Sequence, residues 1–188
     1  FQARVHRVFR QEWKDADKAL MGTLLEESLV REGKAGQLKT RLAALDSLSW
    51  FTAQLIERLR KARVASSGDL VELTHELAET NQAVIAALAQ AREAFPGDDE
   101  EPVKDFLAQL TILETNAQTL TGDQGVQSLR EWELEGINET TSLLARLREE
   151  VKTIHQRAHT LSQGARQDLG ALEATLQAGK ERLILVLS

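Results

Sequence analysis

The histidines are the first residues of this sequence to consider for metal or phosphate chemistry. His155 and His159 are four residues apart, a spacing that places two imidazoles on one helical face, where they could share a zinc ion. A zinc site needs a third ligand, and no His-Glu-x-x-His motif accompanies the pair. The histidines flank Ile154 and Ala158, which we expect in the apolar core, so we interpret them as solvated residues at its edge.

A second histidine lies in a segment that partly matches the phospho-acceptor box of histidine kinases. It reads His75-Glu76-Leu77, followed by Thr80 and Asn81. The polar residue of that box should come one position earlier and its usual proline is missing, so we treat the match as a coincidence. The sequence also lacks Glu-x-x-His pairs suited to a di-iron bundle, a glycine-rich phosphate loop, a nucleophile elbow and cysteine. We therefore expect no enzymatic activity, no metal and no cofactor.

A binding site between helices is the remaining candidate. If the chain folds back near Ser66 and Asp123, several aromatic, amide and guanidinium side chains come to similar heights along a bundle. A buried arginine with amide donors suits a small carboxylate ligand, because the guanidinium forms a bidentate pair. Alternatively, the tryptophans are ordinary core residues and the arginines are solvated. The candidate ligand-binding residues are Trp50, Arg58, Asn81, Arg130, Trp132 and Asn138.

Composition predicts that helices position these residues. The 188 residues are 42% apolar and 4% aromatic, with only two prolines, which is typical of an all-helical bundle. The net charge of −6, with both signs interspersed, argues against nucleic acid as a partner. The absence of cysteine is compatible with an oxidising compartment.

Two short helices are expected in the middle of the chain. Ser66-Ser67-Gly68-Asp69 predicts a break and a capped helix from about 67 to 94. Residues 95–102 hold both prolines and an acidic cluster, which predicts an exposed loop with Pro102 at the first helical position. The next helix should end at Thr121-Gly122. Its apolar stripe is Val103, Phe106, Leu107, Leu110, Leu113, Ala117 and Leu120.

Long helices are expected at both ends. Residues 123–188 contain no proline and carry a coiled-coil seam. For residues 1–65, Gly33 and Gly36 leave two possibilities, a turn or one continuous helix matching the last in length. The seam of the last helix consists of Ile137, Thr140, Leu144, Leu147, Val151, Ile154, Ala158, Leu161, Ala165, Leu169, Leu172, Leu176 and Leu183.

The predicted fold is an all-α, elongated antiparallel bundle with two long terminal helices and two shorter inner ones. Residues 1–188 form a single domain, with a distal four-helix part at about 37–150 and membrane-proximal helices at about 1–36 and 151–188. In this arrangement the two termini lie side by side. We expect Val151, Ile154, Ala158 and Leu161 to be covered partly by a second copy, because two helices cannot cover such a seam alone.

The ends of the sequence suggest a membrane. A basic segment at 180–182 precedes the aliphatic run Leu183-Ile184-Leu185-Val186-Leu187, which we interpret as the start of a membrane span. The chain starts with Phe1 rather than Met, so we expect a fragment bounded by two spans. The alternative is a piece of a soluble coiled-coil protein, in which the aliphatic run is core.

This layout resembles the four-helix and helical bimodular sensor domains of bacterial chemoreceptors and sensor histidine kinases. The resemblance rests on the long terminal helices, the short inner ones and the basic step before Leu183. It implies a periplasmic domain of an inner-membrane receptor, a homodimer that binds a small organic molecule or a periplasmic binding protein. It also implies signal transduction through the last helix and flanking transmembrane helices. The alternative is a structural or adaptor coiled-coil protein without a small-molecule ligand.

Overall fold

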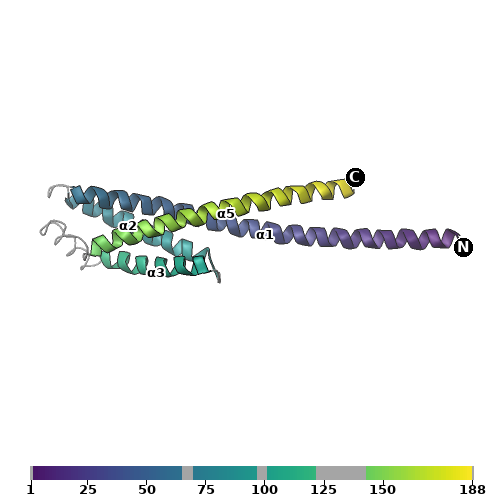
Figure 1. The fold of residues 1–188 in the computed structure, drawn as a ribbon, viewed down its shortest axis with the longest axis horizontal. Helices are drawn as coiled ribbons and strands as arrows, with labels where there is room; N and C mark the ends of the chain where they lie inside the picture. Colours follow the sequence, from purple (N-terminus) through teal and green to yellow (C-terminus); the bar gives the residue numbers. More distant parts are fainter. Residues whose placement is uncertain (1, 65–69, 97–100, 122–142, 188) are drawn as a thin grey trace. The chain divides into compact units, whose positions relative to one another are not determined.

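The computed structural model describes residues 2–64, 70–96, 101–121 and 143–187, and these contain four α-helices and no strand. The helices are α1 (Gln2–Val64), α2 (Leu70–Glu93), α3 (Glu101–Thr121) and α5 (Leu143–Leu187). Figure 1 shows the long α1 and α5 and the shorter α2 and α3. The prediction of an all-α bundle with long terminal helices and shorter inner ones is confirmed.

The helix α1 passes through Gly33 and Gly36 without a turn, which decides between the two possibilities left open by the sequence. A stripe of less exposed residues continues through this region at spacings of three and four, from Met21 and Leu24 through Ala35 and Leu38. A seam with this period favours one helix, and the two glycines together cost only about 2 kcal/mol of helix stability.

The other boundaries agree with the sequence to within a few residues. The helix α3 begins at Glu101, one residue before Pro102. The described α2 begins at Leu70, and its predicted start near Ser67 lies outside the described residues. The predicted start of the last helix near Asp123 lies outside the described residues.

The chain divides into two units, one formed by residues 1–39 and 166–188 and the other by residues 40–165. In the larger unit, segments of all four helices enclose one apolar core. Each helix contributes residues spaced by three and four, as the sequence patterns of α3 and α5 predict. The fully buried large side chains include Leu45, Leu48, Leu55, Leu77, Leu88, Phe106, Leu110, Leu113, Leu147 and Ile154.

The expected dimer seam at the start of α5 is wrong. Val151, Ile154 and Ala158 are at most 1% exposed within a single copy, and Leu161 packs partly buried against the same core. The bundle of the larger unit reaches further along α5 than the sequence predicted, so this stretch needs no second copy to cover it.

Aromatic and guanidinium packing fixes the end of α2 in the larger unit. Phe95 is buried and contacts Phe106 edge to face, with ring centroids 6.2 Å apart. The guanidinium of Arg41 lies 4.8 Å from the Phe95 ring centroid, and its Nε donates a hydrogen bond of 3.3 Å to the Ala94 carbonyl. These contacts attach the residues after α2 to α1.

In the smaller unit, α1 and α5 run antiparallel and two exposed ion pairs connect them. Lys39 lies 2.9 Å from Glu173, and Lys180 lies 3.7 Å from Glu32. Both pairs define the same register, in which residue 25 is level with residue 187. The residues of α1 before this level extend past the end of α5 by about 34 Å at 1.5 Å per residue.

The two helices of the smaller unit therefore point in opposite directions, as predicted, but they do not end at the same level. No helix within the described ranges is long and apolar enough to cross a membrane.

Candidate functional site

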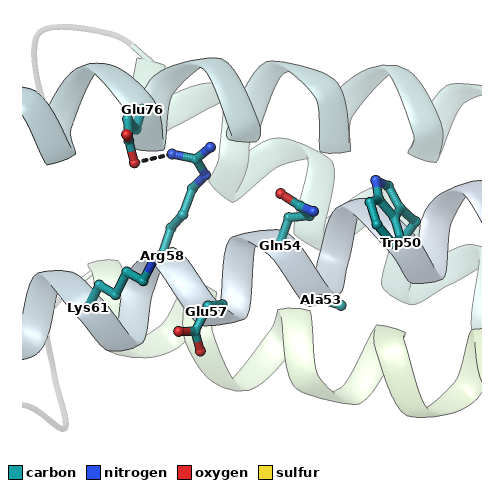
Figure 2. Close-up of a pocket in the computed structure, with 7 residues that line it drawn as sticks. All are labelled: Trp50, Ala53, Gln54, Glu57, Arg58, Lys61 and Glu76. Atoms are coloured by element: carbon teal, nitrogen blue, oxygen red, sulfur yellow. Dashed lines mark hydrogen bonds and ion pairs between the residues drawn. The ribbon is translucent and has the colours of Figure 1, made fainter.

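A groove of about 380 Å³ lies between α1 and α2 in the larger unit. Six of its lining residues come from one stripe of α1, at spacings of three and one, so they share a helical face about 16 Å long. The seventh, Glu76, comes from α2. Figure 2 shows the lining residues, which are Trp50, Ala53, Gln54, Glu57, Arg58, Lys61 and Glu76.

Trp50 and Arg58, two of the six predicted binding residues, both line this groove. The indole of Trp50 is 63% exposed, so it is not a core aromatic residue. Arg58 crosses from α1 to α2 and forms an ion pair with Glu76 through its Nη1 atom (Figure 2). Trp50 and Arg58 are two helical turns apart. Trp50 thus provides an apolar surface at one end of the groove, and Arg58 provides a cation towards the other.

The charges in the groove are balanced. Arg58 and Lys61 face Glu57 and Glu76 as lining residues. Glu57 is also held by Arg60, whose Nε and Nη2 atoms each donate a hydrogen bond of 2.8 Å to its carboxylate. This bidentate hydrogen bonding lowers the pKa of Glu57, with smaller contributions from the charges of Arg60 and Lys61. Glu57 therefore stays a carboxylate to a lower pH than an ordinary glutamate does.

Asn81 lies elsewhere, in the core between α2 and α3. Its side chain is fully buried, and Nδ2 donates a hydrogen bond of 2.7 Å to the Ala117 carbonyl. Its Oδ1 has no hydrogen-bond partner among the described residues. The Arg58–Glu76 pair places Asn81 within a turn of the height of Trp50, as expected, but its side chain does not line the groove. Arg130, Trp132 and Asn138 lie outside the described residues.

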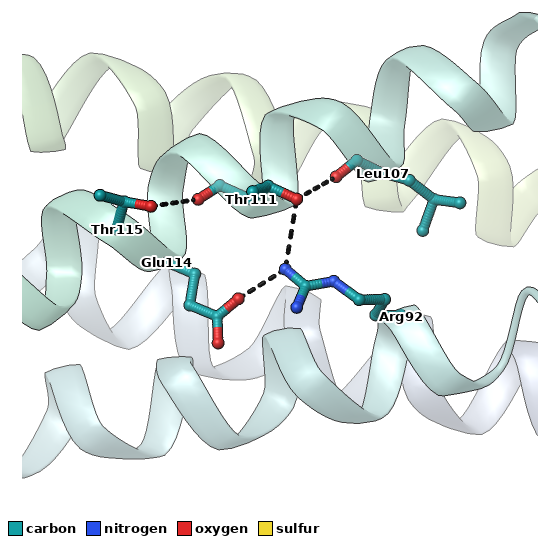
Figure 3. A network of polar contacts seen from close by, with 5 residues as sticks. All are labelled: Arg92, Leu107, Thr111, Glu114 and Thr115. Atoms are coloured by element: carbon teal, nitrogen blue, oxygen red, sulfur yellow. Dashed lines mark hydrogen bonds and ion pairs between the residues drawn. The ribbon is translucent and has the colours of Figure 1, made fainter.

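A second polar cluster connects α2 and α3 on the surface (Figure 3). Arg92 pairs with Glu114 and donates a hydrogen bond of 3.3 Å to the hydroxyl of Thr111. The hydroxyls of Thr111 and Thr115 donate to carbonyls one turn earlier in α3. Each group in this cluster has a partner within the chain, so the cluster acts as a connection between helices.

His155 also connects helices, in this case α5 and α1. Its Nδ1 atom lies 3.1 Å from the hydroxyl of Thr52 and 3.2 Å from the Ser49 carbonyl. Because a carbonyl only accepts, Nδ1 carries the proton and donates. His159 contacts Gln163 on its own helix. Within the described part of the chain, no group of three or more His, Cys, Asp or Glu residues could hold a metal ion.

Sequence reasoning missed five lining residues of the groove. Four of them, Ala53, Gln54, Glu57 and Lys61, follow from Trp50 and Arg58 by helical spacing alone, because they lie on the same face of α1. Glu76 required knowledge of the α1–α2 register. The scan against family models and the searches of curated proteins and solved structures found no match to this chain.

Proposed function

We propose that this chain is the ligand-sensing helical bundle of a bacterial transmembrane receptor of the chemoreceptor or sensor-kinase type, located on the periplasmic side. The groove at Trp50 and Arg58 is the observation that supports it. It combines an exposed aromatic surface with two cationic side chains that lie beside two carboxylates, which suits a small amino acid or another organic acid. The ligand carboxylate binds Arg58 and Lys61, and its apolar part lies on Trp50.

Binding in this groove would change a contact between helices. Arg58 is already paired with Glu76, so a ligand carboxylate competes with Glu76 for the guanidinium. The ion pair joins α1 to α2, and its exchange loosens that connection. Both α1 and α5 belong to the larger unit and continue as single helices into the smaller one. A small displacement of either helix is carried along its stiff axis, which is how such a receptor would pass on its signal.

The test is a screen of organic acids and amino acids against the 188-residue chain, read by thermal unfolding and by Trp50 fluorescence. Trp13 and Trp132 are replaced with phenylalanine so that Trp50 is the only reporter. A ligand held by Arg58 should bind about thirtyfold more weakly to Arg58→Ala, corresponding to about 2 kcal/mol.

Arg31→Ala is the control, because Arg31 is on the same helix, is paired with a glutamate as Arg58 is, and is not among the lining residues. Equal losses of affinity in both variants would contradict the assigned role of Arg58. If no compound changes either signal, direct sensing in this groove is wrong, and recognition of a periplasmic binding protein is the remaining form of the receptor proposal.

A structural or adaptor protein is the second candidate. Its support is the continuity of α1 over 63 residues, a length that suits a rod. A rod needs no ligand in the groove, so its stability should be insensitive to every compound in the screen and to Trp50→Ala.

A further inference from the structure

Glu76 is the lining residue of the groove that comes from α2, and it already holds the guanidinium of Arg58. The side chains of Arg58 and Glu76 are 28% and 44% exposed, so the pair is partly shielded from water. A ligand that binds Arg58 has to displace Glu76 from it. The partner that the Glu76 carboxylate then finds decides which ligands this groove accepts.

The other lining carboxylate, Glu57, does not exchange in this way. Arg60 donates a hydrogen bond of 2.8 Å to each of its two carboxylate oxygens, and such a bidentate arrangement is stronger than a single contact. Figure 2 shows Glu57 pointing away from the pair, whereas Arg58 and Glu76 point towards each other. Glu76 is therefore the carboxylate that changes its partner when a ligand enters.

A simple carboxylic acid binds this arrangement at a cost. Its carboxylate takes the place of Glu76 on the same guanidinium, so the number of ion pairs does not increase and two carboxylates come close together. Like charges at short distance repel, and a partly shielded carboxylate without a partner is disfavoured further. Such an acid gains less from Arg58 than its charge alone suggests.

A zwitterion avoids this cost. Its carboxylate binds Arg58 while its ammonium binds the displaced Glu76, so one ion pair is exchanged for two. An α-amino acid carries both groups on one carbon, which matches the adjacent positions of the guanidinium and the carboxylate that it separates.

Trp50 determines which side chain this amino acid carries. Its indole is 63% exposed, and its position is about 12 Å from that of Arg58 along α1 at 1.5 Å per residue. The groove volume of about 380 Å³ lies near the lower end of the range for small-molecule pockets, about 300–1,000 Å³, so it suits one small molecule that reaches along the groove. An aromatic ring packs on an indole and adds about two- to tenfold in affinity beyond the area it buries.

We propose that Glu76 is the specificity-determining residue of the groove, and that the ligand is an α-amino acid with an aromatic side chain. Arg58 binds the α-carboxylate, Glu76 binds the α-ammonium and the ring lies on Trp50. This inference rests on the proposed function of the groove as a ligand site and adds the class of ligand. The bound amino acid stands between Arg58 and Glu76, so it joins α1 to α2 in place of their direct ion pair.

Four compounds test the three contacts separately, by isothermal titration calorimetry on the 188-residue chain. Phenylalanine carries all three groups, 3-phenylpropionate lacks the ammonium, 2-phenylethylamine lacks the carboxylate and alanine lacks the ring. Phenylalanine should bind at least about tenfold more tightly than 3-phenylpropionate, because only its ammonium forms a charge-assisted hydrogen bond with Glu76. It should also bind more tightly than 2-phenylethylamine and alanine.

Glu76→Gln should change the affinities for two of these compounds in opposite directions. Phenylalanine should bind at least about tenfold more weakly, since its ammonium loses the carboxylate. The affinity for 3-phenylpropionate should increase, since Arg58 no longer has to be taken from a carboxylate. A loss of folding would weaken both, so it cannot produce this result. Glu79→Gln is the matched control and should change neither affinity, because Glu79 is on the same helix, pairs with His75 and is not a lining residue.

The outcomes separate this inference from the proposed function. Equal affinities for phenylalanine and 3-phenylpropionate, or a Glu76→Gln variant without opposite effects, would overturn the role of Glu76 and leave the groove as a site for organic acids. Equal affinities for phenylalanine and alanine would overturn the aromatic ligand. If none of the four binds but the wider screen finds a ligand that depends on Arg58, this inference is wrong and the proposed function stands. If no compound binds, this inference and direct sensing in the groove are both wrong.

Discussion

The buried amide of Asn81 gives a sharp test of how the core of the larger unit is held together. Its Nδ2 donates to the Ala117 carbonyl, while its Oδ1 is buried without a partner among the described residues. Leucine has the same number of side-chain heavy atoms and the same branching as asparagine. We therefore expect Asn81→Leu to be at least as stable as the unchanged protein.

The magnitude follows from three contributions. Losing the hydrogen bond to Ala117 costs about 1 kcal/mol, and a near-isosteric replacement in a packed core adds a cost of up to about 1 kcal/mol. Removing an unpaired buried acceptor returns about 1–3 kcal/mol. The Ala117 carbonyl is not left unpaired, because α3 extends to Thr121, whose backbone N–H is the helical donor for residue 117. Central values of these contributions give a net change of about 0.5 kcal/mol in favour of leucine, and their extremes run from about 1 kcal/mol against it to about 2 kcal/mol in its favour.

Urea unfolding at neutral pH measures this change, provided that the dependence on urea concentration is the same for both proteins. Asn81→Asp is the informative companion, since it keeps the shape but places a carboxylate against a carbonyl. It should lose about 3 kcal/mol or more at neutral pH. Burial raises the pKa of such a carboxyl, so stability should return as the pH falls and the group is protonated.

A loss of more than about 2 kcal/mol in Asn81→Leu would refute the reasoning. It would mean that Oδ1 has a partner, such as a bound water or a ligand, and would support the sequence-based assignment of Asn81 to a binding site.

The other predictions concern the helix surfaces. Arg60→Ala should raise the pKa of Glu57 towards 4.5, because the hydrogen bonds from Arg60 are the main cause of its lowering; carbon-detected NMR titration measures it, and an unchanged midpoint would contradict the assignment. Since the folded-state pKa is the lower one, the stabilisation by this carboxylate is present above 4.5 and lost as the pH falls through the folded-state value. Gly33→Ala should increase the free energy of unfolding by about 1 kcal/mol, because an added Cβ meets nothing within 4 Å; urea unfolding would detect the opposite sign.

Helix positions were predictable because breaks and apolar periods are local properties of a sequence. The stripe of α3 and that of α5 from Leu147 to Leu176 appear in the structure as the less exposed face of each helix. The continuity of α1 was not predictable in this way. The local cost of Gly33 and Gly36 is similar in size to the packing that opposes it, so only the pairing of α1 with its neighbours decides the outcome.

The sequence predicted only part of the candidate site. The height of a residue along a bundle is easier to infer than the face of the helix on which its side chain lies. Trp50 and Asn81 have similar heights, but Asn81 follows Leu77 by four positions and precedes Val84 by three. It therefore belongs to the buried stripe of α2, and its own spacing already indicated the core. Apolar residues three and four positions away mark Asn81 as a core residue, as they do Ile154. This pattern distinguishes Asn81 from the groove residues Trp50 and Arg58.

The polar contacts between α1 and α5 are buried hydrogen bonds in the larger unit and exposed ion pairs in the smaller one. This difference decides where one helix can slide along the other at the lower cost in free energy. In the larger unit, Thr52 meets His155, and Ser162 donates a hydrogen bond of 2.9 Å to Asp46. Ser162 is buried, so sliding α5 along α1 would take its hydroxyl from its partner on α1, at about 1–3 kcal/mol. The Thr52 hydroxyl would keep its hydrogen bond to the Leu48 carbonyl of its own helix.

In the smaller unit, two ion pairs mark the register of α1 and α5, and all four of their side chains are at least half exposed. Such pairs contribute about 0–1 kcal/mol each, and another pairing with solvent or a neighbouring charge replaces them at little cost. Within the α1–α5 pair, the smaller unit is therefore the part in which a shift along the helix axes costs least.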